Sequence, residues 1–182
     1  MIDKETILEK DIPFVIAGLK ERNLIREVAL RTQSFEITQE SNPTGQAKWD
    51  VVILSANTKY VVELKIRKEY YVNDYKGFMI EEKKYAALKN IQNIKGYIPL
   101  YLNFFKNGYQ IWNLNEIPVP CWGLKEYKKY TVIQKGGILK ELKLSADLPN
   151  ALASKHLFKW NLSDKEYENL AYQELNEKYI II

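Results

Sequence analysis

The sequence predicts one mixed α/β domain whose central sheet is mainly antiparallel. Segments with the spacing of a helix stand near both ends and in the middle of the 182 residues, and runs rich in β-branched and aromatic residues separate them. Two small turn-forming pairs, Asn107-Gly108 and Gly136-Gly137, are typical of hairpins between antiparallel strands. The composition, 46% hydrophobic and 27% charged, suits one folded globular domain. We therefore expect a single domain over residues 1–182.

The first half predicts a helix followed by three strands. Residues 4–25 have mixed helical spacing, with Asp11 as the expected cap and Pro13 in the first turn. Apolar alternation then predicts a strand at 32–39, and the Asn-Pro and Gly content predicts a loop at 40–46. The β-branched residues predict strands at 49–54 and 59–66, joined by a turn at 55–58.

The second half predicts a helix, two hairpins and a last helix. Ile80, Ala87, Ile91 and Ile94 recur at helical spacing within 75–94. Hairpins are expected at 97–114 and 129–145, and Ser163 with Glu166 forms a capping box before a helix at 165–178. The apolar end, 179–182, predicts a last strand or a docked terminus. We expect a core over about 4–114 and a C-terminal elaboration over about 115–182.

Composition excludes several function classes. One cysteine, Cys121, allows no internal disulfide, and one histidine, His156, excludes a multi-histidine zinc site and argues against a catalytic triad. The first ten residues are too charged for a signal peptide, and no apolar run approaches the roughly 20 residues of a membrane span. A cytoplasmic protein that does not enter the membrane is expected.

Positive charge is unevenly distributed along the chain. Residues 59–95 carry nine Lys and Arg against five Asp and Glu, and residues 120–143 carry six against two. Each of these segments has a surplus of four, residues 1–58 and 144–182 are each two negative, and residues 96–119 balance, which leaves the net charge of +4. The surpluses are either ordinary solvated lysines or a surface that binds a polyanion.

Three charged residues interrupt the apolar pair of strands at 49–66. Side chains two apart on a strand project to the same face, so Glu63 and Lys65 lie side by side while Leu64 faces a core. Antiparallel pairing through the turn at 55–58 brings Asp50 close to Glu63. The sequence therefore predicts two carboxylates and one ammonium at one place on the sheet.

This combination suits metal-assisted phosphate chemistry. Mg²⁺ prefers one or two carboxylates, a carbonyl oxygen and waters, with remaining positions filled by a phosphate. Asp50, Glu63 and the Leu64 carbonyl would supply the oxygens, and Mn²⁺ is an expected substitute for Mg²⁺. Lys65 would orient the attacking water and offset developing negative charge.

Asp50 followed after a turn by "VELK" resembles the PD-(D/E)XK nuclease superfamily, which includes restriction enzymes, Holliday-junction resolvases and exonucleases. The resemblance covers about residues 4–105 and implies a helix, three antiparallel strands, a helix and a further strand. It implies that Asp50 and Glu63 bind Mg²⁺ and that Lys65 assists the attacking water. Trp49 replaces the proline of the signature.

The resemblance also suggests secondary residues. Some members carry a glutamate on the first helix, for which Glu5, Glu9 and Glu21 compete here. Glu81 and Tyr85, four apart, are similar to a Gln-x-x-x-Tyr element of the exonuclease branch. The expected DNA contacts are Lys68, Lys76, Lys83, Lys84, Tyr85 and Lys89.

The favoured interpretation is a Mg²⁺-dependent DNA endonuclease or exonuclease. Cutting a duplex would call for a homodimer, because one active site breaks one strand. A second interpretation is a non-catalytic nucleic-acid-binding or scaffold module with the same fold. A third is an unrelated α/β domain in which Glu63 and Lys65 form an exposed surface pair.

Overall fold

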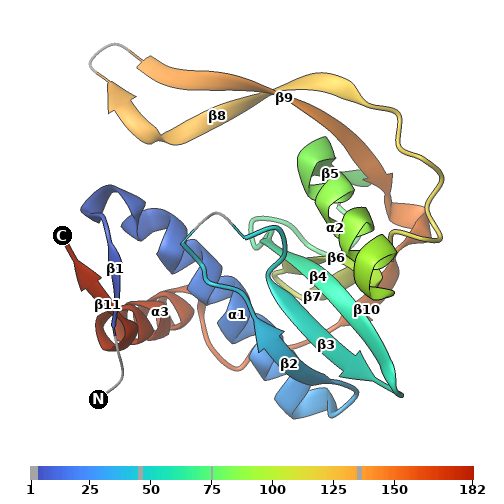
Figure 1. Ribbon diagram of the computed structural model, residues 1–182, viewed down its shortest axis with the longest axis horizontal. Coiled ribbons are helices and arrows are strands. Elements are labelled where there is room, and N and C mark those ends of the chain that lie inside the picture. The colour runs from blue at the N-terminus through green and yellow to red at the C-terminus, as the bar shows by residue number, and fades with distance from the viewer. Residues whose placement is uncertain (1–3, 45–46, 75, 135–136) are drawn as a thin grey trace.

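The computed structural model describes residues 4–44, 47–74, 76–134 and 137–182 (Figure 1). It contains a six-stranded sheet with α1 (Ile12–Thr32) on one face and α2 (Glu82–Lys95) on the other. No helix in these four ranges is long and apolar enough to cross a bilayer. The mixed α/β class is confirmed.

The strand order in the six-stranded sheet is β10-β7-β6-β4-β3-β2. Every neighbouring pair is antiparallel except β4 and β6, which are parallel. The mainly antiparallel sheet is therefore confirmed, and α1-β2-β3-β4-α2-β6 follows the expected αβββαβ order. The strands are β2 (Glu36–Glu40), β3 (Val51–Ser55), β4 (Thr58–Ile66), β6 (Ile98–Phe105), β7 (Gly108–Asn113) and β10 (Ser154–Leu157).

Two tight turns set the register of this sheet. Ala56 and Asn57 both have positive φ, 46° and 66°, which is the conformation of a type I′ hairpin between β3 and β4. The β6–β7 hairpin is present where Asn107-Gly108 predicted one, but it turns at Lys106-Asn107, one residue earlier, and Gly108 is the first residue of β7 and pairs with Phe105. Because these turns are local, counting residues outward from them predicts the strand partners.

The N-terminal helix prediction needs a correction. Residues Glu5–Ile7 form strand β1, which pairs in parallel with β11 (Tyr179–Ile181), and a short helix, Glu9–Asp11, follows. The helix α1 then begins at Ile12, has Pro13 in its first turn as expected, and continues to Thr32. Asp11 precedes the helix, but its side chain makes no capping hydrogen bond. The partner of β1 is the far end of the chain, which local spacing does not reveal.

The helix predicted over 75–94 is also wrong in its first part. Residues Gly77–Glu81 form strand β5, which pairs with β9 (Gly137–Pro149) in a separate three-stranded sheet of order β5-β9-β8. Ile80 is therefore buried on a strand, and Ile94, expected on the buried helix face, is 72% exposed. Leu88 is the helical residue that enters the core.

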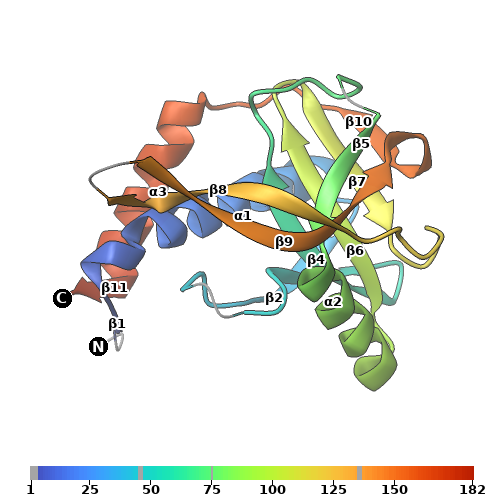
Figure 2. The ribbon, with the colours of Figure 1, turned by 90° about the horizontal axis from the view of Figure 1, so that it is seen from above.

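The second hairpin is longer than the predicted range, 129–145. Strand β8 (Gly123–Gln134) pairs antiparallel with β9, and Gln134 pairs with Gly137; of the predicted Gly136-Gly137 turn, residue 136 lies outside the described residues. Figures 1 and 2 show this two-stranded arm projecting past β5 and crossing above α1. β8 is an edge strand of its sheet.

The C-terminal helix α3 (Asp164–Lys178) has the predicted capping box, in which Ser163 and Glu166 each accept a backbone hydrogen bond from the other. Leu19 of α1 and Ala171 and Leu175 of α3 share a small core, so the two helices lie side by side on one face of the sheet (Figure 1). The short strand predicted at the chain end is present as β11.

The central strand β4 is buried on both faces. Val62 and Leu64 pack into a core with Leu24 and Ile25 of α1, as expected for that face. The opposite face is buried too, because Val61 packs into a second core with Leu88 of α2. A charged residue in the buried middle of this strand, residues 61–64, therefore lies in the interior of the protein.

Candidate active site

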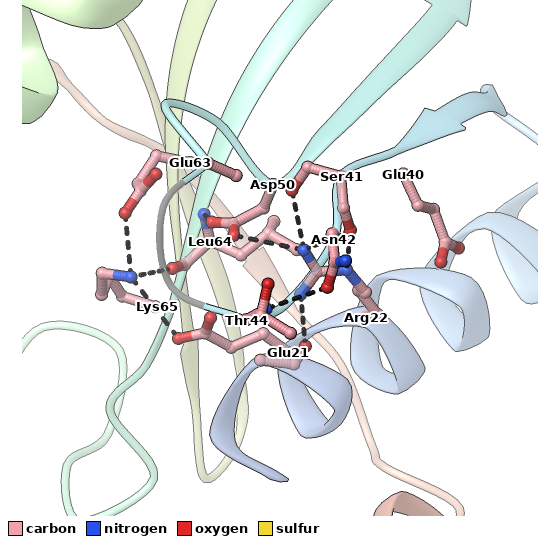
Figure 3. A network of polar contacts seen from close by, with 12 residues as sticks. Glu21, Arg22, Glu40, Ser41, Asn42, Thr44, Asp50, Glu63, Leu64 and Lys65 are labelled. Carbon is pink, nitrogen blue, oxygen red and sulfur yellow. Dashed lines mark hydrogen bonds and ion pairs between the residues drawn. The ribbon is translucent and has the colours of Figure 1, made fainter. Parts of the chain in front are cut away.

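The strand register places Asp50 directly opposite Glu63. Val51 pairs with Val62 across the β3–β4 ladder, and the Asp50 amide donates to the Val62 carbonyl at 2.9 Å. The Asp50 carboxylate accepts a 2.8 Å hydrogen bond from the Leu64 amide, which the ladder leaves free once β3 ends (Figure 3). The predicted meeting of Asp50 and Glu63 therefore occurs, with Asp50 at the edge of the core and 13% exposed.

Glu63 is completely buried, with 0% exposure, and two ammonium groups lie on its carboxylate. Lys65 Nζ is 2.9 Å from Oε1, and Lys84 Nζ is 3.1 Å from Oε2. The contact with Oε1 is an ion pair without hydrogen-bond geometry, so this oxygen accepts no hydrogen bond from the described residues. Burial raises the pKa of Glu63, Lys65 opposes that rise, and the nearby Asp50 adds to it. The exposed surface pair of the third interpretation is therefore wrong.

Lys65 lies between three acceptors. Its Nζ donates to the Leu64 carbonyl at 2.7 Å, pairs with Glu63, and is 3.7 Å from Glu21 Oε1 (Figure 3). Burial disfavours the charged ammonium, but Glu21, Glu63 and Asp50 outweigh it and hold the pKa of Lys65 well above its ordinary value. These carboxylates therefore hold Lys65 in its charged form.

Among the three candidate glutamates, Glu21 is the one that the fold brings to the site. It lies on α1, is 12% exposed and faces Lys65, whereas Glu5 lies in β1 and Glu9 in the short helix before α1. Burial raises the pKa of Glu21 to about 7, against the lowering effect of Lys65 and with further raising by Asp50 and Glu63.

Arg22 fixes the loop that carries Asp50, and sequence reasoning missed it. This side chain, 2% exposed, donates to the Gly18 carbonyl and to the carbonyl and hydroxyl of Ser41, each at 2.8 Å, and its Nη2 is 3.7 Å from Asp50 (Figure 3). A Cβ on Gly18 would lie 2.9 Å from the Pro43 Cβ and 3.0 Å from Arg22 Nη1. The sequence does contain a signal for its burial, because Arg22 follows Leu19 by three residues and so lies on the buried face of α1.

The site opens into a small cavity of about 180 Å³ whose lining includes Glu21, Arg22, Asp50, Lys65 and Lys84. Pockets for small molecules are usually larger, about 300–1,000 Å³. The cavity therefore has room for a hydrated ion, while a polymeric substrate would have to approach from outside.

The donor set fits a hard divalent cation held by few protein ligands. No group of three or more His, Cys, Asp or Glu side chains able to share an ion is present in the described ranges. Two carboxylates, a carbonyl oxygen and water are nevertheless a usual Mg²⁺ environment. Asp50 lies opposite Glu63, and the Leu64 carbonyl comes next along the strand. Glu63 Oε1 accepts no hydrogen bond from the described residues, so a bound ion would satisfy this oxygen.

The residues predicted to contact DNA are spread over different surroundings. Lys84 lies in the site, whereas the Lys68 ammonium lies 4.2 Å above the Tyr167 ring and 3.9 Å from Asp164. Burial lowers the pKa of Lys68. Lys89 donates to Asn115, and Lys76 and Lys83 are exposed. Of this set, only Lys84 contacts a predicted metal ligand.

The predicted Glu81–Tyr85 pair on one helix face is wrong. Glu81 is the last residue of β5 and precedes the first turn of α2, and its carboxylate pairs with Lys143 at 3.0 Å. Tyr85 is helical, but its ring packs edge-to-face against Trp122 at 5.4 Å between centroids. The strand partner of β5 comes from β9, so helical spacing does not apply at Glu81.

Comparisons with known proteins give a structural likeness but no match in sequence. No family model matches the sequence, and no curated protein matches it. The fold is similar to a Holliday junction resolvase from the archaeal hyperthermophile Archaeoglobus fulgidus, with a TM-score of 0.46 and 13% identity over 75% of this chain and 91% of the resolvase. We therefore infer function from the side chains of the site.

Proposed function

We propose that the protein is a divalent-metal-dependent nuclease of the PD-(D/E)XK type that hydrolyses phosphodiester bonds in DNA. The observation that carries the proposal is the buried Glu63 carboxylate, opposite Asp50 in the strand register and 2.9 Å from the Lys65 ammonium. A fully buried carboxylate is costly to keep in a fold unless its charge is used or compensated. Its position beside a small cavity that Asp50, Lys65 and Lys84 help to line supports the proposed use.

Each residue then has a distinct role. Asp50, Glu63 and the Leu64 carbonyl would hold Mg²⁺ or Mn²⁺, which when bound polarises the phosphoryl group and acidifies water. Lys65 positions the attacking water through its Nζ and offsets negative charge that develops on the phosphate. Glu21, 3.7 Å away on α1, holds the Lys65 side chain in that direction. Arg22 keeps the Asp50 loop against α1.

The charge distribution supports a polyanionic substrate. The surplus at residues 59–95 belongs to the segment that builds the site, and the surplus at 120–143 falls mostly on the β8–β9 arm. The arm crosses above α1, the helix that supplies Glu21 (Figure 2). A duplex that reaches the site from outside would meet both segments. Cutting both strands would require two active sites, so a homodimer is part of the proposal.

Cleavage of a supercoiled plasmid and of a branched DNA junction in Mg²⁺ or Mn²⁺ tests this function. Asp50→Asn and Glu63→Gln should each abolish cleavage while keeping DNA binding in Ca²⁺, because each removes a metal ligand that no neighbour replaces. Glu36→Gln, which changes an exposed carboxylate on edge strand β2, is the matched control and should cleave normally.

Two outcomes would contradict the proposal. Cleavage by purified Asp50→Asn or Glu63→Gln would remove the assigned ligands. Salt-sensitive DNA binding by the wild type with no cleavage in any divalent cation would favour the non-catalytic binding module instead.

A further inference from the structure

The charged side chains of the site balance one another without any added ion. Three carboxylates face three cationic side chains, so the formal charges cancel. The close pairs are Arg22 with Asp50 at 3.7 Å, Lys65 with Glu63 at 2.9 Å, Lys65 with Glu21 at 3.7 Å and Lys84 with Glu63 at 3.1 Å. A divalent cation entering this cluster would meet an ammonium at each Glu63 oxygen. One of these cations must give way to it.

Lys84 is the cation held by the fewest contacts, and its shortest contact, 3.1 Å, is longer than the shortest contact of Arg22 or Lys65. Arg22 is 2% exposed and donates to Gly18 and Ser41 as well as facing Asp50. Lys65 donates to its neighbouring carbonyl at 2.7 Å and has two carboxylate partners. Lys84 has one carboxylate partner and a 3.2 Å hydrogen bond to the Ala47 carbonyl, and its side chain is 34% exposed.

The position of Lys84 on its helix is a second, independent observation. Lys84 is the third residue of α2, and Lys83 precedes it in the same first turn. The amino end of a helix carries partial positive charge, so cations are disfavoured there. Lys84 is compensated by Glu63, which lies on a different element. A cation that the helix does not favour, on a long flexible stem, can leave this carboxylate at little cost to the fold.

We propose that Lys84 is a resident counter-ion of Glu63 that competes with the divalent cation for this carboxylate and turns to the substrate phosphate once the cation binds. The proposal rests on the proposed function, because it takes Glu63 as a metal ligand. Coupling between two binding events is reciprocal. The Lys84 ammonium therefore weakens cation binding in the absence of DNA, and bound cation increases the contribution of Lys84 to DNA affinity.

Mn²⁺ titration calorimetry without DNA tests the competition. Lys84→Met removes the charge and keeps the stem, and it should bind Mn²⁺ roughly 5- to 100-fold more tightly than the wild type, the usual range of coupling between sites. Lys95→Met, at the other end of α2 and over the Tyr97 ring, is the control and should bind as the wild type does. Lys84→Arg retains the charge and should keep the weaker affinity. If Lys84→Met does not fold, Lys84→Gln replaces it.

Unchanged or weaker Mn²⁺ binding by the neutral variant would overturn the proposal, as would Lys84→Arg binding as tightly as Lys84→Met. The DNA arm gives a second readout. Lys84→Met should lose more DNA affinity in Ca²⁺ than in EDTA, whereas an equal loss in both would refute the release of Lys84 to phosphate.

Asp50→Asn separates this inference from the proposed function. If Asp50→Asn abolishes Mn²⁺ binding but Lys84→Met leaves the affinity unchanged, Lys84 is not a competitor and the metal site stands. If Asp50→Asn binds Mn²⁺ as the wild type does, the metal site itself is misplaced, and the counter-ion role fails with it.

Discussion

Replacing Lys65 by methionine tests whether its ammonium has a catalytic role beyond stabilising the fold. The change keeps the aliphatic stem and removes one of two cations from Glu63, which is 0% exposed. Breaking a fully buried pair costs about 3–5 kcal/mol. Lys65 is 33% exposed and Lys84 remains on the same carboxylate, so we expect a smaller loss, about 1–3 kcal/mol.

The stability loss should depend on pH in a defined direction. Burial already raises the pKa of Glu63, and Lys65 counteracts this rise. Without Lys65 the pKa of folded Glu63 rises further, so the folded variant takes up a proton more readily than the unfolded chain. The difference from the wild type should therefore be largest at high pH and shrink as the pH falls. Urea unfolding at pH 8 and pH 6 measures it.

Lys65→Met should slow cleavage by more than its loss of stability alone would explain. Loss of a group that positions water and stabilises charge costs roughly 10² or more in rate, about 2.7 kcal/mol. Lys65→Arg keeps the charge but not the compact ammonium, so it should be more stable than Lys65→Met and still slow. Single-turnover cleavage at saturating Mg²⁺, with DNA binding measured in Ca²⁺, gives the rates.

Lys59→Met is the matched control, because Lys59 lies on the same strand and packs over the Tyr97 ring instead of a carboxylate. It should cleave normally. Cleavage by Lys65→Met within a few-fold of wild type would refute the catalytic role. An unchanged stability at pH 8 would refute the electrostatic argument for Glu63.

Three further changes test other parts of the structure. Gly18→Ala should destabilise the protein by about 1–3 kcal/mol despite the better helix propensity of alanine, because the new methyl group meets Pro43. Gly123→Ala, with open space around it, is the control and should be nearly neutral in thermal melts. Glu21 has a folded pKa of about 7 against an ordinary 4.5, so it binds its proton more tightly in the folded state. Wild-type stability should therefore fall as the pH rises from about 4.5 to 7, and Glu21→Gln should flatten this slope. Parallel stability profiles for the two proteins would contradict the assignment. Replacing Lys128, Lys129 and Lys140 of the arm by glutamine should lower DNA affinity and reduce its salt dependence by up to about three ion equivalents, and an unchanged slope would remove the arm from the interface.

The sequence by itself determined the features that depend on neighbours along the chain. Asn107-Gly108 predicts the β6–β7 hairpin, and Ser163 with Glu166 predicts the start of α3, because turns and caps are set by hydrogen bonds within a few residues. The meeting of Asp50 with Glu63 follows the same logic, since a short turn joins their strands and the register can be counted from it.

Tertiary structure decided what surrounds those residues. A strand pattern does not show whether both faces are covered, and only the packing of α1 and α2 on opposite faces of β4 makes Glu63 an interior carboxylate. The same packing brings in Glu21 and Lys84, which lie 42 and 21 residues from Glu63 in the sequence. It also turns residues 77–81 into a strand, because their partner lies about 70 residues away on β9. Contacts between residues so far apart in the sequence depend on how helices and strands pack together. The spacing of neighbouring residues therefore does not predict them.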